Sequence, residues 1–409
     1  MDTVSFGFRA VLNPLADEAT SGEGSGAGAV VGAEVAQEVT DSADTDEVLA
    51  FHRKLPGYEP TPLVSLPGLA DSLGVRELLV KVESTRFGLP AFKMLGASWA
   101  TYRAVRERMA EALDGWADIE ELANLLKPLL PFRLVAATDG NHGRAVARMA
   151  RWLGFDALIF VPSGTTGARI DAIASEGAQV VVVDGGYDEA VARSAEEAGP
   201  RCLVISDTSW PGYADVPRWV IEGYGTMFVE IDDALARAAH DGPDVVVVPI
   251  GVGALAAATA TRFSSRPRGD AGSATVIGVE PTDAACATQS ALAGELIVLG
   301  EPQRSIMAGL NCGTPSPIAW PRVSKGIAGF VTIDDDWARA AVRALASCGI
   351  EAGETGAAAL GGLTALQRQG RATQLAEVVG DESSVLVFVT EGASDLPAWR
   401  TILGTELIG

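Results

Sequence analysis

Short apolar runs with little polar alternation constrain most strongly how this 409-residue chain can fold. Strands of continuous Val, Ile and Leu are typical of parallel sheets that helices cover on both faces. The runs are Leu78–Val82, Leu134–Ala137, Leu158–Val161, Val180–Val183, Leu203–Ile205, Val245–Val248, Val276–Val279 and Val385–Val389. Helical spacing separates most of them, as in Ala145–Leu153 and Ala168–Glu176. The pattern predicts an α/β doubly wound architecture with two lobes, each a mostly parallel twisted sheet covered by helices.

Composition excludes several classes of protein. The net charge of −22 argues against nucleic acid or an anionic membrane as a partner. The most apolar stretch, 245–260, is broken by Pro249, Gly251 and Gly253 and is shorter than the ~20 residues that a membrane span needs. The four cysteines fit no zinc pattern, so no metal site is expected. Asp2 stands where the basic start of a signal peptide would lie, so we expect a soluble, cytoplasmic protein.

The segment 17–47 is rich in Glu, Asp, Gly, Ala, Ser and Thr, and no Lys or Arg stands between Arg9 and Arg53. Such a segment cannot bury enough apolar surface to offset the entropy lost on ordering. We expect a disordered acidic insertion that is dispensable for folding and catalysis. The alternative is an acidic tail that recruits a partner.

Lys93 stands between Phe92 and Met94, where the run Leu78–Val82 gives way to a helical pattern. Desolvation lowers the pKa of a lysine and makes its amine nucleophilic toward an aldehyde, as in Schiff-base lysines. The alternative is a lysine whose stem lies along apolar surface while its charged end stays in water. The local sequence leaves both interpretations open.

Two glycine-bearing loops follow predicted strands and open into helices, and ligands of α/β sheets bind at the carboxyl ends of strands. The first is Thr138-Asp139-Gly140-Asn141-His142-Gly143-Arg144, whose backbone N–H groups suit an anion such as a substrate carboxylate. Its alternative is a plain Asp-Gly turn with an Asn cap.

The second loop, Pro249-Ile250-Gly251-Val252-Gly253-Ala254-Leu255-Ala256, lets the backbone approach a phosphate at a helix N-terminus. Gly251, Gly253 and Ala256 also satisfy a dinucleotide fingerprint, and Glu280 stands where a ribose-binding acid would be. A nicotinamide or flavin oxidoreductase therefore stays open at this point, as does a structural turn that binds no anion.

A lysine between apolar residues, then an asparagine-glycine loop, then a glycine-rich phosphate loop is an order that resembles the fold type II pyridoxal-phosphate (PLP) enzymes. The finer resemblance is to the diaminopropionate ammonia-lyase family, and it covers nearly everything from residue 50 to the end. Serine and threonine dehydratases usually carry Ser where this chain has Asp139. The stretches that carry the resemblance are Thr61-Pro62-Leu63, Arg86-Phe87-Gly88-Leu89, Ala91-Phe92-Lys93, 138–144, Tyr187-Asp188, 207–213, Gly278-Val279-Glu280-Pro281, 307–313, Glu354-Thr355-Gly356 and Thr390-Glu391-Gly392.

The resemblance implies a role for each matching residue. Lys93 would hold the cofactor as a Schiff base and move protons once the substrate displaces it. Asn141 would bind the ring oxygen, and Thr390 would face the pyridine nitrogen. The phosphate would lie on the backbone of Gly251, Val252, Gly253, Ala254 and Leu255. The substrate would contact Thr138, Asp139, Gly140 and His142, and for His142 we prefer a structural role at the helix N-terminus to that of a general base.

Asp139 and Asp188 are the expected working carboxylates, because a substrate with a second ammonium gains from anions nearby. By resemblance, Asp139 would take the α-proton of the L-isomer and Asp188 that of the D-isomer. The alternative for Asp188 is a helix cap. Cys286 and Cys312 fall where the family has a cysteine pair, so we expect them to be close enough to bridge. The cytoplasmic setting favours two buried free thiols instead.

The resemblance implies a large PLP-binding domain, 58–100 with 206–409, a smaller mobile domain, 101–205, an N-terminal segment, 1–57, and a homodimer. The implied function is α,β-elimination of ammonia from 2,3-diaminopropionate to pyruvate and ammonia. The alternatives are a PLP-dependent serine or threonine dehydratase or β-substituting enzyme and, from another class, a dinucleotide-binding oxidoreductase.

Overall fold

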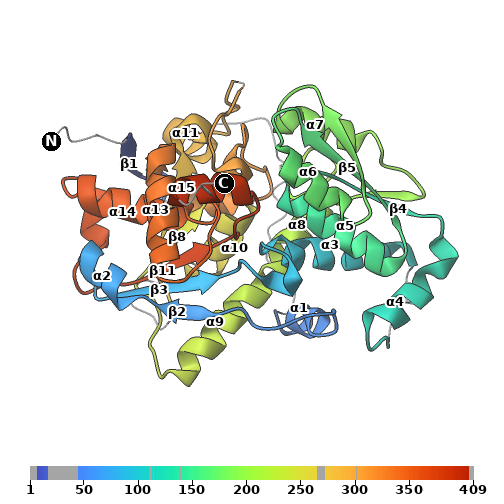
Figure 1. The fold of residues 1–409 in the computed structure, drawn as a ribbon, viewed down its shortest axis with the longest axis horizontal. Coiled ribbons are helices and arrows are strands. Elements are labelled where there is room, and N and C mark those ends of the chain that lie inside the picture. The colour runs from blue at the N-terminus through green and yellow to red at the C-terminus, as the bar shows by residue number, and fades with distance from the viewer. Residues whose placement is uncertain are drawn as a thin grey trace, which may run out of the picture.

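The computed structural model describes residues 7–16, 45–109, 113, 115–138, 140–264, 272–300 and 302–404. It contains a seven-stranded sheet and a four-stranded sheet. The two sheets lie in separate lobes, with the larger one on the left in Figure 1. Parallel pairing dominates both sheets, so the predicted α/β class is confirmed.

The strands are β1 Phe8–Leu12, β2 Leu63–Ser65, β3 Glu77–Val82, β4 Arg133–Ala137, β5 Asp156–Pro162, β6 Gln179–Val183, β7 Cys202–Val204, β8 Val245–Pro249, β9 Thr275–Pro281, β10 Gly329–Ile333 and β11 Ser384–Val389. The helices are α1 Thr45–His52, α2 Pro67–Leu73, α3 Lys93–Met109, α4 Ile119–Leu126, α5 Asn141–Leu153, α6 Gly167–Ala174, α7 Tyr187–Ala195, α8 Asp215–Gly223, α9 Gly225–Arg237, α10 Ala254–Phe263, α11 Cys286–Ala293, α12 Trp320–Gly326, α13 Asp335–Ser347, α14 Ala358–Gln369 and α15 Leu396–Leu403.

The large sheet has the order β1-β10-β9-β8-β11-β3-β2, with antiparallel strands at its two edges. Its central strands are buried on both faces. In β8, Val245 and Val247 pack into the core on one face, and Val246 and Val248 pack into the core on the other. This double burial explains why the runs lack polar alternation. It also leaves the ends of the strands as the places where polar side chains can gather.

The small sheet has the order β6-β5-β4-β7, and all of its strands are parallel. The backbone N–H of Ile205, just after β7, donates to the carbonyl of Val135 in β4 at 2.7 Å. Thr138 and Asp207 therefore follow neighbouring strands at one edge of this sheet. The parallel arrangement brings two polar loops, far apart in sequence, to one place.

Each predicted apolar run lies in a strand or overlaps one by all but its last residue. The sequence analysis missed β1, β2 and β10. β1 and β2 are short antiparallel edge strands that are only partly buried, so they lack the apolar run that marks a central strand. β10 is fully buried, but Gly329 and Thr332 interrupt its apolar residues.

The structure bears only in part on the predicted acidic insertion and on the predicted domain boundaries. Most of the predicted acidic insertion 17–47, residues 17–44, lies outside the described residues. Residues 45–47, at the approximate end of this segment, begin α1, where Asp46 and Glu47 favour the N-terminal turn. The domain boundaries stay a prediction, and α3 runs without a break across the one at residue 100. Among the described residues, no helix is long and apolar enough to cross a membrane.

A buried cluster of charges supports the connection between β3 and α3. The Arg86 guanidinium donates to Glu83 and to Glu230, each through two bonds of 2.7–2.8 Å, and all three side chains are at most 3% exposed. Lys81 Nζ donates to Glu230 Oε2 at 2.7 Å. Two cations and two carboxylates thus compensate one another away from water. The cluster fixes the start of the loop that leads to Lys93.

The buried cluster makes a prediction about stability. Arg86→Met should lower the free energy of unfolding by about 3–5 kcal/mol, because it leaves two buried carboxylates short of one positive charge. Urea unfolding measures this loss. The matched control is Arg76→Met, whose ion pair with Asp244 is more than half exposed on both sides. Its loss should stay below about 1 kcal/mol. Equal losses of unfolding free energy in the two variants would show that Arg86 is not needed to compensate the buried carboxylates.

Candidate active site

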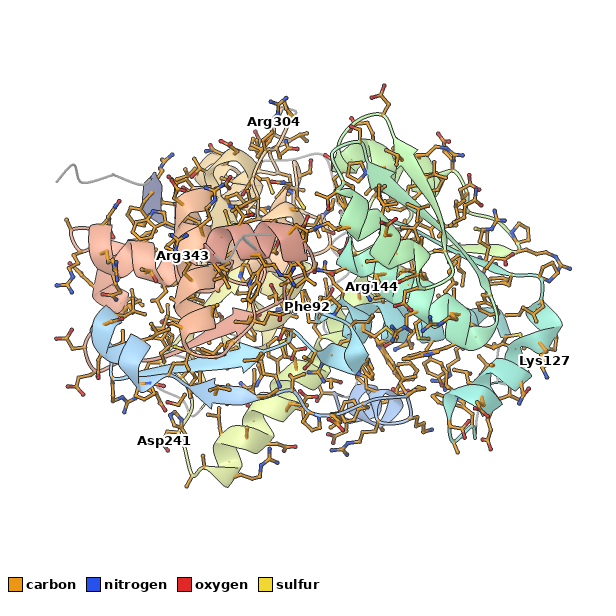
Figure 2. The ribbon with its side chains drawn as sticks, in the orientation of Figure 1. Phe92, Lys127, Arg144, Asp241, Arg304 and Arg343 are labelled. Carbon is orange, nitrogen blue, oxygen red and sulfur yellow. The ribbon has the colours of Figure 1, made fainter. Side chains whose placement is uncertain are left out.

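Lys93 is the first residue of α3, and the loop before it is tied to the end of β11. Ala91 forms an antiparallel bridge with Glu391, the N–H of Phe92 donates to the carbonyl of Thr390 at 3.3 Å, and the N–H of Gly392 donates to the carbonyl of Pro90 at 2.8 Å. Phe92 lies in the middle of the molecule, where the two lobes meet (Figure 2). The lysine is therefore held at the carboxyl ends of β3 and β11.

The Lys93 amine meets a carboxylate from the other lobe. Its Nζ donates to Asp207 Oδ2 at 2.7 Å, and the Tyr187 hydroxyl donates to Asp207 Oδ1 at 2.8 Å. The side chains of Lys93 and Asp207 are 20% and 6% exposed. Burial raises the pKa of Asp207, but the charges of Lys93 and His142 and the hydrogen bonds from Lys93 and Tyr187 together hold that pKa well below its usual range. Asp207 is thus an ionised, buried carboxylate in contact with the amine.

The loop that carries Asp207 is anchored on both sides. The Tyr213 hydroxyl donates to the carbonyl of Val204 at 2.7 Å and accepts from the N–H of Ser206 at 3.1 Å. The N–H of Ser209 donates to the Ser316 hydroxyl at 3.0 Å, and this bond ties the loop to the large lobe. These bonds fix Asp207 at the end of β7, next to β4.

Sequence reasoning chose Asp188 and missed Asp207. Asp188 is the second residue of α7, accepts from the Thr314 hydroxyl at 3.4 Å and does not line the cavity around Lys93. Its neighbour Tyr187 does line it. The role of Asp188 stays a prediction, whereas the structure brings Asp207 to Lys93. The sequence did carry a signal for Asp207. It follows the apolar run Leu203–Ile205, just as Thr138 follows the run of the neighbouring strand β4, and polar residues in that position tend to face a ligand site.

The glycine loop after β8 forms a cradle at the N-terminus of α10. Gly253 caps that helix with φ of 95°, a left-handed conformation that glycine adopts without strain. A Cβ on Gly251 would lie 2.9 Å from the carbonyl oxygen of Gly309 and 3.2 Å from Cys312 Sγ. The backbone therefore approaches another loop more closely than a side chain allows. Free N–H groups and the helix dipole suit this cradle to a phosphate.

The other predicted loop lies across the cavity. Asn141 opens α5, and its Nδ2 donates to the Glu391 carboxylate. The Thr138 hydroxyl accepts from the N–H of Gly140 at 2.8 Å. His142 Nε2 donates to the carbonyl of Ile205 at 2.7 Å, which supports the preferred structural role. Asp139 lies outside the described residues.

These loops line one cavity at the strand ends, where the two lobes meet. Predicted residues that line it are Lys93, Asn141, Gly251, Val252, Gly253, Ala254, Leu255 and Thr390. Thr138, Gly140 and His142 are buried beside it and do not line it. Sequence reasoning assigned no role to Tyr187, Asp207 and Glu391, which also line it. Among the described residues, Lys93 is the one Lys or Arg in the lining.

Two further expectations concern residues near the glycine loop. Cys286 and Cys312 are both buried and both lie near Gly251. Cys286 Sγ is 3.9 Å from the Gly251 carbonyl oxygen, and Cys312 Sγ is 3.2 Å from where a Cβ on Gly251 would lie. The predicted bridge between them stays a prediction. Glu280 accepts from the N–H groups of Ala287 and Thr288, both at 2.8 Å, and so caps α11. Both oxygens of this fully buried carboxylate are engaged by α11, which argues against the dinucleotide alternative.

Comparison with known proteins agrees with this geometry. A family described as pyridoxal-phosphate dependent enzyme matches residues 54–390. The diaminopropionate ammonia-lyase of Escherichia coli K12 is 36% identical over 367 residues, which cover 86% of this chain and 89% of that one. The crystal structure of the E. coli enzyme with an aminoacrylate–PLP azomethine reaction intermediate superposes with a TM-score of 0.81 at 30% identity, covering 98% and 97%. The processed threonine deaminase isoform 2 of Solanum lycopersicum shares the fold, with a TM-score of 0.66 at 23% identity over 90% and 95% of the two chains. The resemblance stated from the sequence is confirmed.

The cradle makes a prediction about binding. Gly251→Ala places a methyl group against Gly309 and Cys312, so the loops must move apart and the N–H groups lose their alignment. We expect the affinity for pyridoxal phosphate to fall at least about tenfold, which corresponds to ~1.4 kcal/mol. Absorbance titration of the apoprotein measures it. The control is Gly68→Ala, because nothing lies within 4 Å of its added Cβ. Unchanged affinity in Gly251→Ala would place the phosphate elsewhere.

Proposed function

The chain belongs to the pyridoxal-phosphate dependent enzymes, and from that premise we propose that it is a carbon–nitrogen lyase that eliminates ammonia from 2,3-diaminopropionate. With one water consumed, the products are pyruvate and two molecules of ammonia. The observation that carries the proposal is the contact of 2.7 Å between Lys93 Nζ and the buried carboxylate of Asp207 inside the cavity. The similarity to relatives that bear this activity in their names supports it.

The residues that line the cavity fit the cofactor. The N–H groups at residues 251–255 suit its phosphate, the Asn141 amide suits its ring oxygen, and the Lys93 amine is placed to hold it covalently. Thr390 is buried at the end of β11 and offers a hydroxyl for the pyridine nitrogen. A hydroxyl there does not force protonation of the ring as a carboxylate would, which suits elimination better than transamination. When bound, the cofactor withdraws electron density from the substrate α-carbon and so makes its proton acidic.

Lys93 and Asp207 are placed to manage that proton. Lys93 Nζ would accept the α-proton as a general base when it does not hold the cofactor. Asp207 holds the amine in place through the bond of 2.7 Å and stabilises the ammonium that forms. Tyr187 fixes the other carboxylate oxygen and so sets the direction of Asp207.

The charges in the cavity favour a substrate with an additional cation. Asp207 and Glu391 both line it. Arg169 Nη2 lies 3.7 Å from Glu391 Oε1 and offsets that charge, whereas Asp207 would lose the charge of Lys93 once this amine holds the cofactor. Diaminopropionate differs from serine by a second ammonium, which gains from anions at short range.

A substrate panel tests the proposed function. Release of pyruvate and ammonia is measured with both enantiomers of diaminopropionate, with both enantiomers of serine and with L-threonine. The expected result is a higher kcat/KM for diaminopropionate than for any hydroxy amino acid. Preference for serine or threonine would make the chain a dehydratase and overturn the proposed substrate.

The two candidate carboxylates can be separated by matched variants. Asp207→Asn should lower kcat/KM at least about 100-fold with one or both enantiomers of diaminopropionate, because the Lys93 amine loses the charge that holds and stabilises it, and a misplaced reacting group costs about that much. Asp188→Asn should change it less than about threefold, because Asp188 lies outside the cavity lining. Asp139→Asn, measured beside them, tests the predicted base for the L-isomer. A large loss in Asp188→Asn confined to the D-isomer would restore the role that the resemblance implies.

We also propose a cytoplasmic homodimer. Leu292, Leu296 and Val298 are 42%, 36% and 69% exposed within one short stretch at the end of α11, and grouped apolar exposure supports a surface that a second copy covers. A mass in solution of twice that of the chain, measured by sedimentation equilibrium, would support the dimer. The mass of a single chain would contradict it.

A further inference from the structure

Glu391 occupies a site where three segments of the large lobe converge. It follows β11, is 2% exposed and lines the cavity. Its backbone forms the bridge to Ala91, two residues before Lys93, and its carbonyl accepts from the N–H of Gly353 at 3.1 Å. The chain at this point is therefore fixed from both sides.

Two glycines make room for it. A Cβ on Gly356 would lie 2.1 Å from the Glu391 carbonyl oxygen, and a Cβ on Gly353 would lie 3.0 Å from Glu391 Oε1. A side chain on Gly356 would displace the backbone of Glu391, and one on Gly353 would press on its carboxylate. The absence of side chains at these two positions lets Glu391 pack closely against residues 353–356.

The Glu391 carboxylate meets two helices of the small lobe. Asn141 Nδ2, at the start of α5, donates to Glu391 Oε2, and Arg169 Nη2, on α6, lies 3.7 Å from Oε1. Arg169 is itself 7% exposed. Glu391 thus joins the end of the large sheet to α5 and α6 across the cavity.

We propose that Glu391 is a positioning residue that sets the orientation of the Asn141 amide toward the cofactor. An ionised carboxylate only accepts, so the NH₂ group of Asn141 must point to Glu391. Among the described residues no other group accepts from this NH₂, so its second N–H can donate to a ligand. A ring oxygen that carries negative charge needs such a donor. A neutral amide in place of Glu391 could donate to Asn141 Oδ1 instead and turn the amide over. The inference rests on the proposed use of pyridoxal phosphate.

The test is a double-mutant cycle on cofactor affinity, with Glu391→Gln, Asn141→Ala and the double variant. Pyridoxal phosphate is titrated into each apoprotein, and the absorption maximum of the bound cofactor is recorded without substrate. Glu391→Gln should weaken binding about tenfold, as for a lost hydrogen bond to a charged group. The double variant should be no weaker than Asn141→Ala, because Glu391 acts through that amide.

The matched control is Glu354→Gln, a buried carboxylate that also interacts with Arg169 but does not line the cavity. Its affinity and absorption should match the wild type. If Glu391→Gln yields too little folded protein, Glu391→Asp serves instead, because it keeps the charge and withdraws the oxygens from Asn141. Additive losses in the cycle, or equal behaviour of the Glu391 and Glu354 variants, would overturn the inference.

A third result would also overturn it: a higher KM for diaminopropionate in Glu391→Gln with unchanged cofactor affinity, since the carboxylate would then act on the substrate by charge alone. Failure of the proposed function looks different. A wild type that binds pyridoxal phosphate but releases no ammonia from diaminopropionate would refute the substrate while leaving the cycle on Asn141 intact.

Discussion

The contact between the Lys93 amine and the Asp207 carboxylate is the interaction on which the site depends. Lys93 comes from the connection between β3 and α3, and Asp207 comes from the loop after β7 in the other sheet. Burial would oppose a charge on either group alone, so each is stable there because the other is present. The pair can form only where the strand ends of both lobes face one cavity.

The surrounding structure keeps those strand ends in place. The buried cluster around Arg86 fixes the loop before Lys93, and the bridge between Ala91 and Glu391 fixes its end. Tyr213 and Ser316 hold the Asp207 loop. The glycine cradle then needs no charged side chain, because backbone N–H groups and the dipole of α10 serve an anion. The reactive side chains are thus held at rigid strand ends, and the loops that follow the strands form the walls of the cavity.

The local sequence predicts most of the strands and the glycine cradle, for physical reasons. Buried parallel strands require continuous apolar runs, so β3–β9 and β11 could be predicted, and glycine loops at strand ends marked the cradle. Asp207, Glu391 and Arg86 act through partners more than 100 positions away in the chain, and no local pattern reveals such pairs. The role of Asp188 came from the family resemblance and stays a prediction; the Asp188 carboxylate accepts from the Thr314 hydroxyl at 3.4 Å.

The central claim is that Lys93 is the amine that binds the cofactor. Borohydride reduction of the yellow holoenzyme, followed by peptide mapping, tests it most directly. The account predicts that the reduced cofactor is attached to the peptide that contains Lys93, and that Lys93→Ala takes up no label and has no turnover. Attachment to a different lysine in the wild-type protein would contradict it.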